Sequence, residues 1–184
     1  MKKVVISVLG TDRPGIVAAV SRILLENRCN IEDVAQTILQ TEFTGIFIAS
    51  IPKALQPENV RTQLEADLAP LGLRILLKPL EAAVEKTSPP ECQPFVITTI
   101  GPDRLGLVAG ITEVIARFGV NITNLRAAFR GGNDPTANTM IYEVDVPVEI
   151  DRPSFRQALL DRANQLGLEL SVQHREIFEA LHRI

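Results

Sequence analysis

A nine-residue segment near the N-terminus recurs in the middle of the chain with its spacing kept. Residues 10–18, GTDRPGIVA, return 91 positions later as 101–109, GPDRLGLVA. The same offset relates Asn30-Ile31 to Asn121-Ile122. Self-similarity over so long a span indicates two homologous domains, and the period is too long for a solenoid. The 184 residues also suit two domains of roughly 90 residues, each with its own core.

The repeat also predicts the domain boundaries. We expect a first domain at 1–79, a linker at 80–93, a second domain at 94–175 and a tail at 176–184 that can extend as a short helix. The linker is rich in proline and charge, and its apolar periodicity is lost. Leu71-Gly72-Leu73 recurs at 166–168 with an offset of 95, so the second copy contains four extra residues. We place them in the turn-forming segment 130–138.

Within each copy, the pattern of apolar residues changes between strand and helix spacing. In the first copy we expect strands at 4–9, 31–39, 46–51 and 73–77, and helices that begin at Ile16 and Pro57. Asn30 would end the first helix, Thr44-Gly45 would form the hairpin turn, and Gly72 would end the second helix. The second copy repeats this order, with strands at 95–100, 122–129, 139–146 and 168–172 and helices at 107–118 and 153–166. The order βαββαβ predicts an α+β fold, the ferredoxin-like sandwich, with an antiparallel sheet and both helices on one face.

The loop between the first strand and the first helix carries the chemistry that the two copies share. A helix N-terminus presents unpaired N–H groups and the positive end of the helix dipole, which suit a carboxylate or a phosphate. Gly15 and Gly106 would let a ligand approach the backbone closely. Asn30 and Asn121 offer both a hydrogen-bond donor and an acceptor.

Each of these residues also has a purely structural explanation. The two aspartates, Asp12 and Asp103, can serve as helix N-caps. The glycines can serve close packing between helix and sheet, the asparagines can be turn residues that end a helix, and the loop arginines can be solvated. Recurrence in both copies does not by itself separate these alternatives.

Other functions lack support in the residues. The net charge of −3 argues against binding of nucleic-acid phosphates, and 4% aromatic residues leave few platforms for stacking RNA bases. Ile16-Val17 stands where a P-loop needs Lys-Ser/Thr, no nucleophile–base constellation recurs, and no metal-ligand spacing is present. We therefore expect no catalytic residues, no cofactor and no metal. No apolar run is long enough for a membrane span, and no signal peptide is recognisable, which predicts a cytoplasmic protein.

The segments DRPGIV at 12–17 and CNIED at 29–33 resemble the ACT domain family. The first segment follows the first predicted strand, and the second leads into the second predicted strand. The second copy is similar to ACT domains generally, with Leu105 in place of the proline. The resemblance implies domains that pair, often into one continuous sheet, and bind amino acids at the seam. It nominates as ligand-binding residues Asp12, Gly15, Ile16, Asn30 and Ile31, and then Asp103, Gly106, Leu107, Asn121 and Ile122. We add Arg13 and Arg104 to this set, because an arginine in the loop can bind a carboxylate.

Two such domains in one chain resemble the glycine cleavage system regulators, a tandem-ACT group. This resemblance implies a sensor of a small amino acid such as glycine that acts through a protein partner such as a transcriptional activator, without direct contact to nucleic acid or membrane. A homodimer is expected, with pairing of the ACT domains within one chain or across two. The alternative is an ACT-domain interaction or regulatory subunit of a metabolic enzyme that has no ligand of its own.

Overall fold

The computed structural model describes residues 2–80, 91–128 and 138–182, and they form two compact units. We call residues 2–80 unit 1 and the remaining described residues unit 2. Most of the predicted linker 80–93, and most of the segment 130–138 in which we place the four extra residues, lie outside the described residues.

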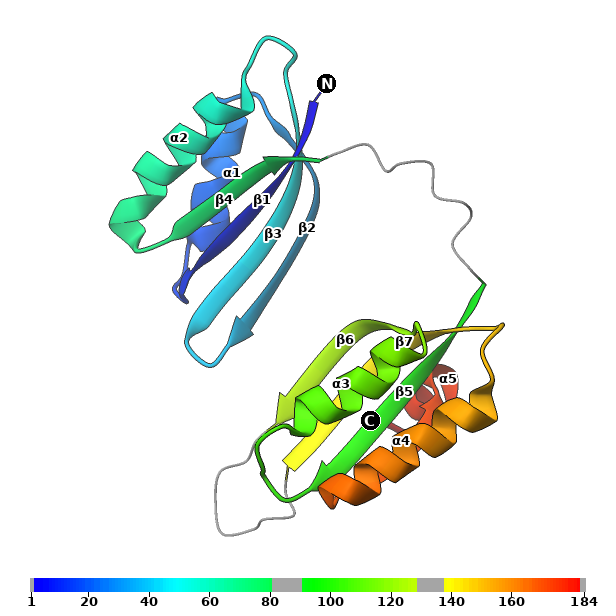
Figure 1. Ribbon diagram of the computed structural model, residues 1–184. Helices are drawn as coiled ribbons and strands as arrows, with labels where there is room; N and C mark the ends of the chain where they lie inside the picture. The colour runs from blue at the N-terminus through cyan, green and yellow to red at the C-terminus, as the bar shows by residue number, and fades with distance from the viewer. Residues whose placement is uncertain (1, 81–90, 129–137, 183–184) are drawn as a thin grey trace. The chain divides into compact units, whose positions relative to one another are not determined.

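Unit 1 is a four-stranded antiparallel sheet with two helices on one face (Figure 1). Its elements are β1 (Lys2–Thr11), α1 (Ile16–Glu26), β2 (Asn30–Leu39), β3 (Glu42–Ile51), α2 (Pro57–Leu68), a 3-10 turn (Ala69–Leu71) and β4 (Arg74–Pro79). The strand order is β2-β3-β1-β4, so β2 and β4 are the edges of the sheet.

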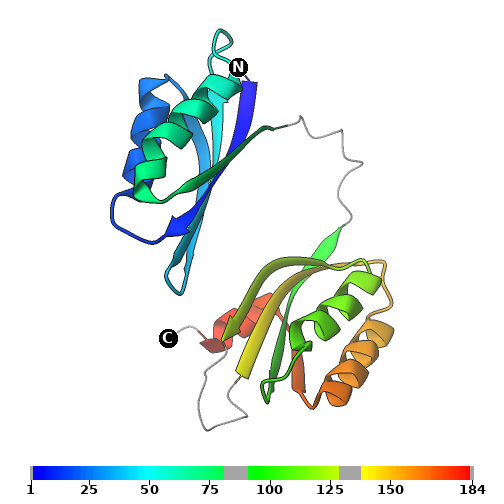
Figure 2. The ribbon, with the colours of Figure 1, turned by 60° about the vertical axis from the view of Figure 1, so that its left-hand side comes forward.

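Unit 2 repeats this arrangement and adds a helix. Its elements are β5 (Cys92–Gly101), α3 (Leu107–Arg117), β6 (Asn121–Ala128), β7 (Asn138–Pro147), α4 (Arg152–Leu166), β8 (Glu169–His174) and α5 (Arg175–His182). The strand order is β6-β7-β5-β8. Figures 1 and 2 agree that α3 and α4 cover one face of this sheet. The prediction of two ferredoxin-like βαββαβ units is confirmed.

The core of each unit forms where the apolar side of the sheet meets the apolar side of the two helices. In β1, Val4, Ile6 and Val8 alternate toward the helices and are fully buried. In α1, the residues buried against them follow helical spacing, namely Ile16, Val20, Ile23 and Leu24. This packing fixes the direction of α1, and therefore the end of the sheet at which its N-terminus lies.

Repeated glycines allow β1 and β5 to approach the turn that precedes the last strand. A Cβ atom on Gly10 would lie 2.9 Å from the carbonyl oxygen of Gly72, and one on Gly101 would lie 2.9 Å from that of Gly167. Gly72 and Gly167 themselves are left-handed, with φ of 73° and 67°, and they end the helical segments as predicted for Gly72. The repeated glycines at 10 and 101 therefore serve backbone packing.

Two local predictions are wrong. The β2–β3 turn lies at Gln40-Thr41, because β3 begins at Glu42 and already contains Thr44 and Gly45. The first helix ends at Glu26, with Asn27 as its C-cap, and Asn30 is the first residue of β2. Gln40 adopts a φ of 55°, which is uncommon for a residue other than glycine. The sequence therefore gives no sign that the turn begins there.

Candidate functional site

The loop between β1 and α1 is open to solvent. Asp12, Arg13 and Gly15 are exposed, and Ile16 is the first residue to enter the core, at 2% exposure. The Asp12 amide donates a 2.7 Å hydrogen bond to the carbonyl oxygen of Thr41, which joins the loop to the β2–β3 turn. The loop is thus anchored at its beginning, and its helix-leading part remains accessible.

Glycine occupies the N-cap position of the first helix in both units. Gly15 has φ 96° and ψ −2°, and Gly106 has φ 85° and ψ 5°. Space is open around both, because a Cβ atom placed there would meet nothing within 4 Å. The alternative that these glycines serve close helix–sheet packing is therefore wrong, and their left-handed backbone is what requires glycine.

The two aspartates do not cap these helices. Neither α1 nor α3 receives a side-chain hydrogen bond at its N-terminus, and neither has an acidic residue in its first turn. The first intrahelical bonds run from the Ala19 amide to the Gly15 oxygen and from the Gly110 amide to the Gly106 oxygen, at 2.9 and 2.8 Å. The three amides before each of these bonds stand at the positive end of the helix dipole, the geometry that suits an anion.

The second loop differs from the first in its side chains. Leu105, at the position of Pro14, is fully exposed, and Gly106 is exposed as well. Arg104 lies beside Gly167, because a Cβ atom placed on Gly167 would lie 3.5 Å from Nη1 of Arg104. Leu107 is 2% exposed and enters the core as Ile16 does. The second loop therefore keeps the backbone arrangement and adds an apolar side chain at the surface.

The two predicted parts of the ligand site lie at opposite ends of each sheet. Asn30 pairs with Ser50, which lies beside Lys3 at the start of β1, whereas Asp12 follows the last residue of β1. At about 3.4 Å per residue, the two ends are separated by roughly 27 Å. Unit 2 has the same arrangement, because Asn121 pairs with Asp145 near the start of β5, and Asp103 follows its end. One unit alone does not bring the loop and the asparagine together.

The second part of the predicted site lies in a surface groove of unit 2. Asn121 and Ile122 line a groove of about 400 Å³ together with Val120, which precedes β6, and with four residues of α3, namely Thr112, Glu113, Ile115 and Ala116. Asn121 is exposed and Ile122 is half-buried, as are Asn30 and Ile31 respectively in unit 1. The groove is shallow and open to solvent, and four of its seven lining residues are apolar.

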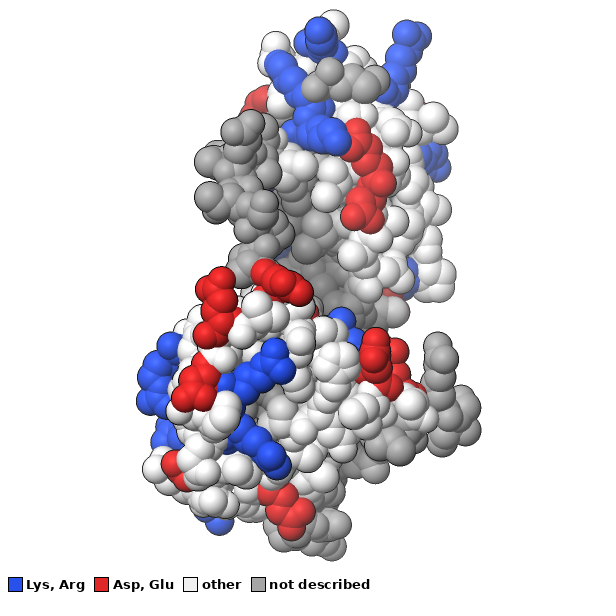
Figure 3. All heavy atoms as spheres, turned by 90° about the vertical axis from the view of Figure 1, so that its right-hand side faces the viewer, with Lys and Arg blue, Asp and Glu red and all other residues white. Residues whose placement is uncertain are grey.

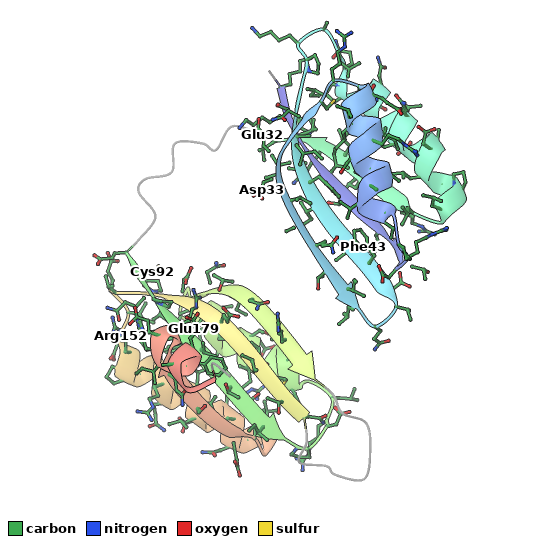
Figure 4. All side chains as sticks on the ribbon, turned by 180° about the vertical axis from the view of Figure 1, so that it is seen from behind. Glu32, Asp33, Phe43, Cys92, Arg152 and Glu179 are labelled. Atoms are coloured by element: carbon green, nitrogen blue, oxygen red, sulfur yellow. The ribbon has the colours of Figure 1, made fainter. Side chains whose placement is uncertain are left out.

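Sequence reasoning missed a charged cluster beside Asn30. Glu32, labelled in Figure 4, lies at the β-bulge between Ile31 and Asp33. Its carboxylate forms a 2.5 Å ion pair with Lys3. Hydrogen bonding to Lys3 lowers the pKa of Glu32. In unit 2 the cation comes from the start of α5, since Arg175 lies 3.6 Å from Glu143 and 3.7 Å from Asp145. Because the repeat carries Lys3 onto Pro94, the alignment of the two copies gives no signal for this cluster.

The edge strands β2 and β6 carry apolar side chains that are partly exposed on the side of the sheet that faces the helices. Val34 and Ile38 in β2 are 48% and 50% exposed, although they pair with the buried Phe47 and Phe43. Leu125 in β6 corresponds to Val34 and is 38% exposed. Helices α1 and α3 thus do not fully cover these edges, which leaves apolar surface next to the predicted asparagines.

No alternative chemistry emerges from the described residues. Basic and acidic side chains are interspersed over both units on the surface that Figure 3 shows. The described residues contain no cluster of three or more His, Cys, Asp or Glu side chains arranged to hold a metal ion. None of the described helices is long and apolar enough to cross a membrane. Cys29 is buried, and burial raises the pKa of its thiol, which disfavours the reactive thiolate.

The chain matches a known domain twice. A family model of the ACT domain matches residues 2–78 and again residues 93–173. A UPF0237 protein of Methanosarcina mazei is 41% identical over 91 residues, which are 49% of this chain and 95% of that protein. A UPF0237 protein of Methanocaldococcus jannaschii is 38% identical over 79 residues, which are 42% of this chain and 88% of that protein. These relatives are about as long as one of the two copies.

Solved structures resemble the whole chain. A protein from Galdieria sulphuraria is 24% identical with a TM-score of 0.76, and the match covers 94% of this chain and 98% of that one. A protein described as a glycine cleavage system transcriptional repressor is 23% identical with a TM-score of 0.63, and the match covers 94% of this chain and 96% of that one. At these identities the likeness shows a shared fold.

Proposed function

The chain belongs to the ACT domain family, and on that basis we propose that it is a regulatory protein without catalytic activity that senses a small amino acid. One observation carries the proposal. In both units an exposed loop ends in a left-handed glycine, Gly15 or Gly106, and leads into a helix whose first turn has no side-chain cap. An uncapped N-terminus that is kept in both copies is suited to a ligand carboxylate.

The proposed ligand is an amino acid as small as glycine. Its carboxylate would accept hydrogen bonds from the first-turn amides of α1 or α3, beginning at Ile16 or Leu107. Its ammonium group would donate to the side-chain oxygen of Asn30 or Asn121. Glycine has five heavy atoms, so a ceiling of about 1.5 kcal/mol per atom limits binding to roughly 7 kcal/mol, a micromolar dissociation constant at best.

Such a site needs two ACT units. Because the loop and the asparagine lie roughly 27 Å apart at opposite ends of one sheet, a single ligand can contact both only if they come from different units. The open edge of β2 or β6, with its partly exposed Val34 or Leu125, supplies a surface at which a further ACT unit can add. We propose that ligand binding stabilises this pairing.

The regulatory output would pass to a protein partner, such as a transcriptional activator, and not directly to nucleic acid. The net charge of −3 and the interspersed surface charges in Figure 3 support this part of the proposal. The fold shared with a protein described as a glycine cleavage system transcriptional repressor supports it as well. A cytoplasmic location belongs to the same proposal.

One observation favours a second function, an interaction or regulatory subunit of a metabolic enzyme with no ligand of its own. Leu105 is fully exposed in the second loop, where its apolar side chain is available for a contact with another protein. The two functions differ in their response to amino acids.

Isothermal titration calorimetry of the full chain with glycine and other common amino acids tests the proposal. We expect saturable binding of at least one small amino acid with a dissociation constant between micromolar and millimolar. An Asp67→Lys variant, changed on the exposed surface of α2, serves as a control and should bind equally well. Absence of heat from every amino acid at millimolar concentration would favour the second function.

A further inference from the structure

The two sheets differ in what lies on the face away from their paired helices. In unit 2, α5 packs across this face against β5 and β8, as the view from behind shows (Figure 4). Val96 points to this face from the middle of β5, and it is 1% exposed. Arg175, the first residue of α5, holds the helix there through Glu143 and Asp145. Unit 2 thus covers its open face with a segment of its own.

Among the described residues of unit 1, no segment takes the place of α5, and the same face is more apolar. It carries Leu9 at 50% exposure, Ile46 at 49% and Leu76 at 64%. Val5 and Ile48 lie half-buried between them. The strand register places Val5 directly opposite Ile48, and it places Ser7 between Ile46 and Leu76. These five apolar side chains form one continuous surface across β3, β1 and β4, which we call the unit 1 face.

Opposite charges flank the unit 1 face, with a carboxylate at the β2 edge of the sheet and an ammonium group at the β4 edge. One row across the sheet runs from Asp33 in β2 through Ile48 and Val5 to Lys78 in β4. Asp33 and Lys78 are both exposed, and they lie on opposite edges of the sheet. Glu32 is already paired with Lys3, so Asp33 is the carboxylate that remains at this end of β2.

This pattern is complementary to itself. Two sheets stacked face to face about a twofold axis parallel to the strands place the β2 edge of one copy over the β4 edge of the other. Asp33 then faces Lys78 of the second copy, and Ile48 faces Val5 of the second copy. Sheets in sandwiches stack in this way about 10 Å apart, with strands inclined by about 30°.

We propose that the unit 1 face is a homodimer interface on which a second copy of this chain packs its own unit 1 face. Four strands about 4.8 Å apart and five rows of about 3.4 Å give a projected area of roughly 300 Å² per copy. This area is comparable to the largest apolar patch on a typical monomer, and it lies below the roughly 800 Å² per partner of a standard interface, so the paired charges must contribute to the association. The dimer is therefore weak and exchanges readily. It does not depend on the amino-acid site, because it uses side chains on the face of the sheet and leaves the backbone edge of β2 free to pair with another strand.

Sedimentation equilibrium of the full chain with charge-reversed variants tests the proposal. Wild-type protein should dimerise with a micromolar dissociation constant. Asp33→Lys and Lys78→Glu should each weaken self-association at least about tenfold, because like charges then meet across the twofold axis. An equimolar mixture of the two variants should recover the dimer, since each variant supplies the charge that the other requires.

Two further variants make the result decisive. Ile46→Glu places a charge in the centre of the unit 1 face and should leave a monomer with unchanged circular dichroism. Asp67→Lys reverses a charge on α2 and should leave the dimer intact. A wild-type monomer at hundreds of micromolar protein would overturn the proposal, and so would an Ile46→Glu dimer as tight as the wild type. Failure of the mixture to recover the dimer would overturn the proposed orientation.

Discussion

Thr99 occupies in unit 2 the place that Val8 occupies in unit 1, and both side chains are completely buried. The register confirms the correspondence, because each residue lies on the same inner strand of its sheet, β1 or β5, and points to the helices. The hydroxyl of Thr99 has no hydrogen-bond partner among the described residues. The duplication has thus produced two nearly isosteric sites, one of which contains an unpaired polar atom.

Thr99→Val should stabilise the protein by about 1 kcal/mol, because it removes a buried hydroxyl that has lost its water without gaining a partner. The reciprocal Val8→Thr should destabilise it by a similar amount. Thermal unfolding followed by circular dichroism measures both changes. A Thr99→Val variant less stable than the wild type would show that the hydroxyl does have a partner.

Gly15→Ala and Gly106→Ala should each destabilise the protein by about 1 kcal/mol, because alanine pays a steric cost at φ values of 96° and 85°. Space is not the cause, since nothing lies within 4 Å of either position. Chemical denaturation measures the loss. Gly10→Ala is the informative comparison: its Cβ atom would lie 2.9 Å from backbone, so it should cost more than either. Equal stability of Gly15→Ala and the wild type would contradict the left-handed loop.

Stability should fall as pH rises from about 10 to about 12, in part because of Tyr142. Burial raises the pKa of Tyr142 from 10.0 to about 12 in the folded protein. The unfolded chain therefore loses this proton first, so the stabilisation is complete below pH 10 and is lost as pH approaches 12. Tyr142→Phe should flatten this part of the profile. An unchanged slope in denaturation curves of the variant would assign the effect to other groups.

The repeat predicted the architecture because it fixes element order and length in two copies at once. Alternating Val4, Ile6 and Val8, and the helical spacing from Ile16 to Leu24, determine which faces are buried. Gly72 predicted a helix end because few other residues adopt its backbone conformation readily. Apolar periodicity and glycine positions are local features, so they can be recognised in the sequence without knowledge of tertiary contacts.

The remaining features depend on tertiary contacts that a single sequence does not display. The interpretation of Asp12 and Asp103 as N-caps was wrong because Gly15 and Gly106, three residues later, occupy the N-cap positions. The β2–β3 turn was misplaced because Gln40 takes a positive φ without being Gly, Asn or Asp. The covering of Val96 by α5 could not be predicted, because nothing in the tail sequence states which face of the sheet it contacts.

Asn30→Ala and Asn121→Ala should each weaken amino-acid binding, and the double variant should abolish it, because the proposed ammonium contact is lost in both copies. Calorimetry measures the change. Asn30 and Asn121 are exposed, so thermal stability should change by less than about 0.5 kcal/mol. If only one single variant affects binding, only that asparagine contributes to a site. Full affinity in the double variant would exclude the asparagines from the site.

The most direct test of amino-acid sensing is a titration of uniformly ¹⁵N-labelled full chain with glycine, followed by amide chemical shifts. The account predicts saturable shifts in two separate groups of residues, at Gly15–Val17 or Gly106–Val108 and around Asn30 or Asn121. Both groups should follow one binding curve, although they lie at opposite ends of each sheet. Shifts confined to one end would contradict a site shared by two units. Unchanged spectra at millimolar glycine, and with every other common amino acid, would contradict sensing itself.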